Sequence, residues 1–196
     1  MKKILFSILL VFSIMSSCND TDDVIVGPTY DRITLLNNWF NNHINPSFNN
    51  FSNELSQLKS DFTSAKNDGI DEASLEKLRN TFKSTYAAWQ YVEMFNIGKA
   101  EEIYYSATVN IYPVNTVRVE SNINSGNYDL NNPNNYAAQG LPTIDYILFG
   151  IGSSDTEILE KLKDEEKYMN YLSSIIEEMA SNTTKVINDW ETYKAE

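Results

Sequence analysis

Segment 140–150 places one acidic side chain, Asp145, in an otherwise apolar helical turn. Its apolar residues recur at the spacing i, i+3 and i+7, as Leu141, Ile144 and Leu148. This spacing predicts a helix with one buried face, and Pro142 fits its first turn, where a missing N–H has no partner to lose. A carboxylate beside a buried face must be hydrogen-bonded, ion-paired or bound to a ligand, or it stays protonated. Asp145 is therefore a candidate ligand-binding residue, and the alternative is a structural Asp that bonds the end of a neighbouring helix.

Three further acids could supply oxygen ligands: Glu93, Glu101 and Glu102. Glu93 lies one turn beyond Trp89 on a predicted helix, so it could face the same seam. A few carboxylates in a helical bundle can hold iron, or hard cations such as calcium or magnesium. The sequence therefore predicts a metal site made of Asp145 and Glu93, with the other two acids as additional ligands. The alternative for all three glutamates is a solvated helix end.

The chain contains one histidine, His43, and one cysteine, Cys18. A catalytic zinc site needs about three protein ligands and an open position, which one histidine cannot provide. The sequence also lacks a Gly-x-Ser-x-Gly elbow and a phosphate-binding loop. A single histidine is more often a surface or core residue than a ligand. These observations leave the catalytic residues, if the protein has any, unidentified.

The charge balance excludes one class of partner. The chain has 15 Lys and Arg against 27 Asp and Glu, which gives a formal net charge of −12. Binding of nucleic acid depends on clustered cations, so we expect no nucleic-acid partner. The 12 Tyr, 9 Phe and 3 Trp are enough for a core, and the length suits one domain.

The N-terminus has the pattern of a secretory signal. Two lysines precede an apolar run over residues 4–15, which is shorter than the roughly 20 residues of a membrane-spanning helix. Cys18 follows Ser16 and Ser17 directly, the arrangement of a bacterial lipoprotein cleavage and acylation site. An ordinary signal peptide with an incidental cysteine is the alternative.

We therefore expect a lipoprotein signal peptide over residues 1–17, an acidic flexible tether over 18–30 and one helical domain over 31–196. A lipid on Cys18 would hold the protein at a membrane without spanning it. The predicted location is the cell envelope, at the outer membrane, facing either the periplasm or the cell surface.

Periodic apolar residues predict an all-α, up-down bundle of four principal helices with a long irregular crossover insertion. The first stripe contains Ile44, Phe48, Phe51, Leu55, Leu58, Phe62 and Ala65. Its spacing is that of a bundle helix, which Pro46 should kink or divide. Asp71 should cap a second helix that continues to about residue 97 and stops at Gly98.

The remaining elements are expected further along the chain. Residues 99–135 are predicted to be irregular, with short helices near 100–105 and 114–123. A motif helix over 137–149, a short helix over 155–162 capped by Asp155, and a last helix from about residue 164 should follow. The asparagine-rich stretches near 37–53 and 122–135 are expected to reflect composition rather than chemistry.

The motif segment resembles that of imelysin-like proteins, in which Gly-x-His-x-x-Glu precedes an aromatic residue and a Leu-Phe-Gly ending. Gly140 and Asp145 fall into this register, with Asp145 at the position of the Glu and Pro142 at that of the His. Segment 88–98 resembles the family's Trp-containing helix. Segment 111–115, with Glu120 beyond it, resembles a Trp/Tyr-Pro-Val-Asp motif.

This resemblance implies one half, the N-terminal one, of a fold made of two packed bundles, either as a one-bundle variant or as a truncated chain. It implies a lipid-anchored, iron-regulated envelope protein. Because the motif His is absent, we expect a non-catalytic protein that binds iron, haem or another ligand during uptake, with Gly140 and Asp145 in the site. The alternatives are a metal-dependent peptidase with a peptide ligand, and a structural module that binds an envelope protein.

Overall fold

The computed structural model describes residues 31–193, so the predicted signal peptide, Cys18 and the tether lie outside the described residues. The chain divides into two compact units, Met1–Thr34 and Leu35–Glu196. Every described buried residue belongs to the second unit, from Phe40 to Val186. Within the described part, no helix combines the length and the apolar character that crossing a membrane requires.

The first helical stretch consists of α2 (Arg32–Trp39), the π-helical turn η1 (Phe40–Ile44) and α3 (Asn45–Asp68). In η1 the N–H of Asn45 donates to the carbonyl of Phe40. Pro46 follows directly; it has no N–H, and its ring would clash with a carbonyl one turn earlier in a regular helix. The wider π turn relieves this clash. The helical stretch is thus not divided at Pro46: it continues from Arg32 to Asp68, and the predicted irregularity takes the form of the π turn. The predicted stripe from Ile44 to Ala65 is buried throughout.

The second long helix, α4 (Glu72–Trp89), begins at the predicted cap. The N–H of Ser74 donates to Asp71 Oδ1 at 2.8 Å, and the N–H of Asp71 donates to Ser74 Oγ at 2.8 Å. The predicted end near residue 97 is wrong, because α4 ends at Trp89 and the chain continues in turns. Val92 is buried and Phe95 packs against the core in these turns, whereas Glu93 and Ile97 are exposed.

A buried carboxylate joins these two helices. Asp61 of α3 is 5% exposed, and it accepts from Lys77 Nζ at 2.8 Å, Thr81 Oγ1 at 2.7 Å and Gln57 Nε2 at 2.8 Å. Burial raises its pKa, but the three donors outweigh burial and hold the pKa below its ordinary value. Asp61 is thus a fully satisfied structural residue.

The predicted irregular region contains α5 (Lys99–Glu102), α6 (Tyr105–Val109), α7 (Thr116–Ser125) and the 3-10 helix η2 (Pro133–Ala138). The helix expected near 114–123 corresponds to α7. The one expected near 100–105 is two shorter helices, because Tyr104 adopts a left-handed conformation with φ of 55°.

Buried asparagines tie this region to the bundle. Asn122 Nδ2 lies 3.1 Å from Asn135 Oδ1 and 3.0 Å from the Tyr171 hydroxyl, which donates to the carbonyl of Ala138 at 2.6 Å. Asn135 Nδ2 also donates to the carbonyl of Asp129 at 2.8 Å, so these side chains satisfy backbone carbonyls of the irregular region. Asn122 and Asn135 therefore have a structural role.

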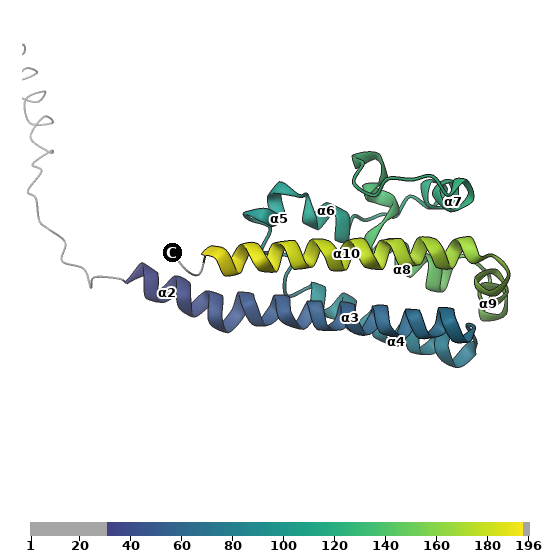
Figure 1. The fold of residues 1–196 in the computed structure, drawn as a ribbon, viewed down its shortest axis with the longest axis horizontal. Helices are drawn as coiled ribbons and strands as arrows, with labels where there is room; N and C mark the ends of the chain where they lie inside the picture. Colours follow the sequence, from purple (N-terminus) through teal and green to yellow (C-terminus); the bar gives the residue numbers. More distant parts are fainter. Residues whose placement is uncertain (1–30, 194–196) are drawn as a thin grey trace, which may run out of the picture. The chain divides into compact units, whose positions relative to one another are not determined.

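The C-terminal helices are α9 (Asp155–Asp164) and α10 (Glu166–Tyr193). Ser154, not Asp155, caps α9, with its Oγ accepting from the N–H of Glu157 at 3.3 Å. Figure 1 shows α3, α4 and α10 running side by side, with α5, α6 and α7 across α10 from α3. No strand occurs within residues 31–193, so the predicted all-α fold is confirmed.

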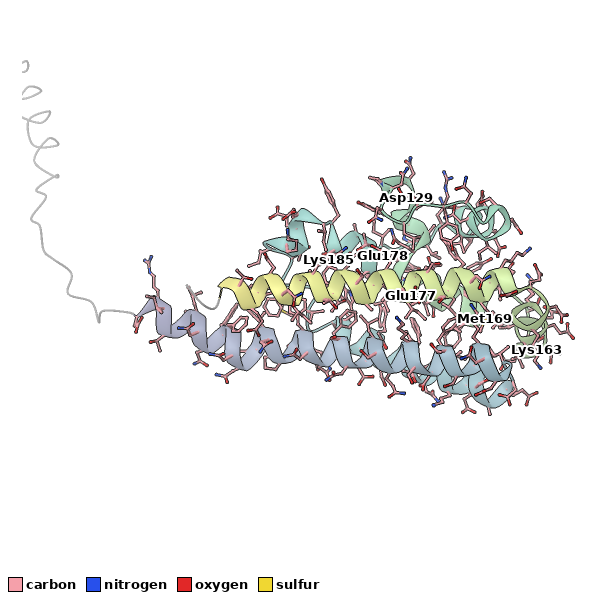
Figure 2. The ribbon with its side chains drawn as sticks, viewed as in Figure 1. Asp129, Lys163, Met169, Glu177, Glu178 and Lys185 are labelled. Carbon is pink, nitrogen blue, oxygen red and sulfur yellow. The ribbon has the colours of Figure 1, made fainter. Side chains whose placement is uncertain are left out.

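Two buried polar residues, Asn182 and Thr183, interrupt the apolar face of α10, and both have hydrogen-bond partners. Asn182 is buried; its Nδ2 donates to Glu178 Oε1 at 3.0 Å, and its Oδ1 accepts from Lys185 Nζ at 2.8 Å. Thr183 Oγ1 lies 2.7 Å from the Tyr105 hydroxyl. Glu177, by contrast, is 3.9 Å from Lys59 Nζ of α3 (Figure 2). Opposite faces of α10 therefore contact α3 and the insertion.

Candidate functional site

The motif segment is helical but interrupted. It contains α8 (Gly140–Asp145) and the π-helical turn η3 (Tyr146–Gly150). The predicted start at residue 137 is wrong, because Gln139 is extended and separates η2 from α8. The predicted buried face is present: Leu141, Ile144 and Leu148 are at most 1% exposed.

Gly140 has a steric role in this segment. Its φ is +73°, and a Cβ at this position would lie 2.2 Å from the carbonyl oxygen of Val109 at the end of α6. Any side chain would push the two segments apart. The structure therefore gives the first residue of the motif a packing function, and Gly140 is absent from the groove described below.

Asp145 occupies the last position of α8 and is exposed, although its helical neighbours are buried. The sequence correctly places Asp145 beside a buried face, but the core does not enclose its carboxylate. No hydrogen bond or ion pair within residues 31–193 engages it. Partial burial raises the pKa of the Asp145 carboxyl above its ordinary value. The structural alternative, an Asp bonded to a neighbouring helix end, is not what this geometry shows.

Asp145 lines a groove of about 330 Å³. Its walls come from α4, from the segment between α6 and α7, and from α8, and they contain Phe82, Tyr86, Asn110, Tyr112, Val114, Leu141, Pro142 and Asp145. We call this set the Asp145 groove. It is mostly apolar, within the size range of ligand pockets in proteins.

The three aromatic members of the Asp145 groove, Phe82, Tyr86 and Tyr112, were not predicted as site residues. Phe82 is buried, whereas Tyr86 is 43% exposed and Tyr112 is 87% exposed. Tyr112 belongs to segment 111–115, and that motif was the signal in the sequence that could have identified it. Pro142, at the position of the motif His, lines the groove beside Asp145.

The other predicted ligands lie elsewhere. Glu93 is exposed in the turns after α4, and Glu101 and Glu102 are exposed on α5, where Glu102 pairs with Lys99. None of the three lines the Asp145 groove, and His43 is exposed in η1. Throughout the described chain, no group of three or more His, Cys, Asp or Glu side chains could hold a metal ion. The residues present therefore do not fit the predicted metal site.

A second carboxylate near the motif is fully engaged. Glu120 of α7 accepts from the Tyr146 hydroxyl at 2.8 Å and from the Tyr168 hydroxyl at 2.7 Å. Burial, together with this carboxylate, raises the pKa of Tyr146 to about 12 and also raises that of Tyr168. Both phenols remain neutral donors at physiological pH, so they hold α7 against η3 and α10 and cannot act as bases.

Arg79 of α4 holds the end of the motif segment. Its Nε donates to the carbonyl of Leu148 at 2.9 Å, and its guanidinium pairs with Asp155 at 2.8 Å and lies 4.7 Å from the ring centre of Phe149. A helix end leaves carbonyls without partners, and Arg79 satisfies one of them. Close packing at Gly140 and the Arg79 hydrogen bond thus hold the two ends of the motif segment. Asp145, between them, has no hydrogen-bond or ion-pair partner within the described residues.

The comparisons with known proteins address the fold and the motif together. No curated protein sequence matches the chain. One similar solved structure is the crystal structure of a protein described as an iron-regulated protein A precursor from Parabacteroides distasonis, with a TM-score of 0.67 and 19% sequence identity. The match covers 82% of this chain and 45% of that one, so the chain spans less than half of that structure. A family model described as imelysin, peptidase family M75, matches residues 44–196. Because this match includes most of the sequence and all of the motif segment, the chain belongs to the imelysin family.

Proposed function

We propose that this protein is a non-catalytic binding protein of the bacterial cell envelope, anchored through Cys18, which captures a ligand for uptake in the Asp145 groove. One observation carries the proposal: an unpartnered carboxylate at the edge of a mostly apolar groove. Asp61 and Glu120, which are less exposed and hold the fold together, both have donors.

Binding without catalysis fits the lining better than metal-dependent hydrolysis does. A catalytic zinc takes about three protein ligands, whereas the groove offers one carboxylate and the amide of Asn110. We therefore propose that any iron carried by this protein reaches the groove inside an organic ligand whose own atoms coordinate it. The link to iron rests on the relative, which is described as iron-regulated.

Calorimetric titration of residues 19–196 tests the binding function. This fragment keeps every described buried residue. The titrants are ferrous and ferric iron, haem, calcium and a mixture of short peptides. We expect at least one organic titrant to bind and Asp145→Ala to abolish its binding. Asp164→Ala, an exposed acid at the end of α9, is the matched control and should bind as the wild type does. If none of the titrants bound, or if Asp145→Ala bound equally well, the binding function would be wrong.

The anchor is tested separately in cells. We expect labelled palmitate to be incorporated into the wild-type protein, and Cys18→Ser to abolish incorporation and release the protein from membranes. Digestion of intact cells by an added protease then distinguishes the surface from the periplasmic face. Incorporation into Cys18→Ser would exclude this anchor.

A further inference from the structure

We propose that the Asp145 groove binds an organic ammonium ion, that is, a positively charged nitrogen carried on an apolar body. This inference rests on the proposed binding function and names the class of ligand. It follows from the charge and the chemistry of the groove's walls.

Asp145 lacks the donors that three less exposed carboxylates of this fold possess. Asp61 has three donors, Glu120 has two phenols, and Asp189 accepts the N–H of Lys99 at 2.9 Å. Asp145 has none of these within the described residues. A partly desolvated carboxylate without donors is stabilised most by a positive charge. No lysine or arginine lines the groove, so that charge must come from a ligand.

Aromatic rings supply the second feature that a cation would use. Phe82, Tyr86 and Tyr112 all line the groove, and the rings of Phe82 and Tyr86 lie 6.1 Å apart between their centres. The faces of aromatic rings carry negative electrostatic potential and attract ammonium groups. The same rings, with Leu141 and Pro142, can cover the apolar carbons attached to the charged nitrogen.

Two basic residues of α4 have contacts outside the groove. Arg79 is engaged by Asp155 and the carbonyl of Leu148, and both Arg79 and Lys83 lie over the ring of Phe149, at 4.7 and 6.0 Å from its centre. None of Arg79, Lys83 and Phe149 lines the groove, so Asp145 carries the one formal charge among its lining residues.

Three other ligand classes fit less well. An anion would meet Asp145 without any cation to offset it. A metal ion such as calcium takes six to eight oxygens, whereas the walls are mostly apolar. A neutral apolar molecule would leave the carboxylate desolvated and unpaired. In addition, three polar groups of the lining have no partner in residues 31–193: the hydroxyls of Tyr86 and Tyr112 and the side-chain amide of Asn110. Their oxygen atoms can accept hydrogen bonds from the N–H groups of an amine.

The test compares charged and neutral molecules of the same shape. Residues 19–196 are titrated with choline and its neutral isostere 3,3-dimethylbutan-1-ol, and with N-acetyl-lysine amide and the neutral N-acetyl-norleucine amide. Binding is followed by the NMR shifts of groove amides and by calorimetry at constant ionic strength. Choline represents a free small amine, and the lysine derivative represents a basic side chain on a peptide.

We expect one or both charged probes to bind and the neutral isosteres to bind at least about tenfold more weakly, the effect of one charge-assisted contact. Asp145→Asn should weaken binding of the charged probes by a similar factor, and Tyr112→Leu by about two- to fivefold, which is the effect of one exposed cation–π contact. Asp164→Asn should change neither. The probe that binds more tightly identifies the source of the ammonium group.

Two results would overturn the inference. One is that neither charged probe binds the wild type. The other is that the charged and neutral members of each pair bind equally and Asp145→Asn changes nothing. In either case the binding function itself survives if an organic titrant of the calorimetric panel still depends on Asp145, and it fails only if that panel fails too.

Discussion

Asp145 has no hydrogen-bond or ion-pair partner within residues 31–193, whereas Asp61 and Glu120 have such partners. Partial burial raises the pKa of the Asp145 carboxyl, so its ionisation opposes folding as the pH rises from the ordinary pKa of about 4 to the raised value. In the proposed binding function, a positively charged ligand would compensate for this cost.

We therefore expect Asp145→Asn to leave the stability of the ligand-free protein equal to or slightly above that of the wild type, by less than about 0.5 kcal/mol near neutral pH. Urea unfolding followed by circular dichroism measures it. A loss of more than about 1 kcal/mol would show that Asp145 has a structural partner.

Asp61 should behave in the opposite way. Its carboxylate holds three donors, so Asp61→Asn should lower stability by about 1–3 kcal/mol near neutral pH. Its folded pKa lies below the ordinary value, so its contribution is complete above about pH 4 and declines as the pH falls through the lowered pKa. The difference between wild type and Asp61→Asn should therefore shrink in acid, as unfolding at a series of pH values will measure. A difference that grew in acid would contradict this assignment.

Gly140 provides a test of the steric reading of the motif. The alanine of Gly140→Ala must adopt a positive φ, and its Cβ would lie 2.2 Å from the Val109 carbonyl oxygen. We therefore expect this variant's free energy of unfolding to fall by about 3 kcal/mol or more. Gly126→Ala is the matched control, because Gly126 also has positive φ but nothing within 4 Å of its Cβ, and it should lose only about 1–2 kcal/mol. Thermal unfolding of both variants measures the difference. Equal losses would mean that backbone conformation alone explains Gly140.

At the scale of elements, the carboxylate of Glu120 is what joins α7, η3 and α10. Glu120→Gln removes the charge that strengthens both phenolic hydrogen bonds. We therefore expect it to lower the free energy of unfolding by about 1–3 kcal/mol. It should also lower the pKa of Tyr146 from about 12 toward the ordinary value, although burial will keep part of the shift. Spectrophotometric titration of the tyrosines follows this change. An unaltered titration curve would show that burial alone sets both pKa values.

The elements differ in how far the sequence predicts them, and the reason is physical. The stripes of α3, α4 and α10 are local repeats that each bury one face, so periodicity alone predicted their positions. The end of α4 was missed because Val92 continues the apolar spacing after Trp89 and is buried, although the backbone there forms turns. Periodicity shows which residues could be buried, but not whether the backbone that carries them stays helical.

The candidate site depended on longer-range information. Asp145 was identifiable from its own turn, because an acid in an apolar helix is unusual. Its groove was not, since α4, the segment after α6 and α8 contribute walls that meet only in the folded chain. Similarly, the buried Asn122 bonds to Tyr171, which lies far along the sequence, and to Asn135. The predicted metal ligands were chosen by type and spacing along one chain segment, which says nothing about their distance from Asp145.

At the scale of the whole molecule, the chain spans less than half of the similar solved structure. The buried apolar residues of its described part nevertheless pack in a single core. The buried residues from Phe40 to Val186 form one hydrophobic cluster that includes α3, α4, α8 and α10. Residues near both ends of the described chain pack together in this cluster, since the ring centres of Phe40 and Trp190 lie 6.2 Å apart. We infer that folding requires this C-terminal turn but not the unit Met1–Thr34.

Two truncations test this inference. A chain that begins at Leu35 removes no described buried residue, so its free energy of unfolding should stay within about 0.5 kcal/mol of that of residues 19–196. A chain that ends at Val186 lacks Trp190, which packs on Phe40, and Asp189, which accepts from the N–H of Lys99. Its free energy of unfolding should be lower by about 3 kcal/mol or more, since deleting a large aromatic contact alone costs about this much. Urea unfolding of the three proteins measures both effects. If the first truncation unfolded the protein while the second did not, the core would extend into the unit Met1–Thr34, and the division of the chain at Leu35 would be wrong.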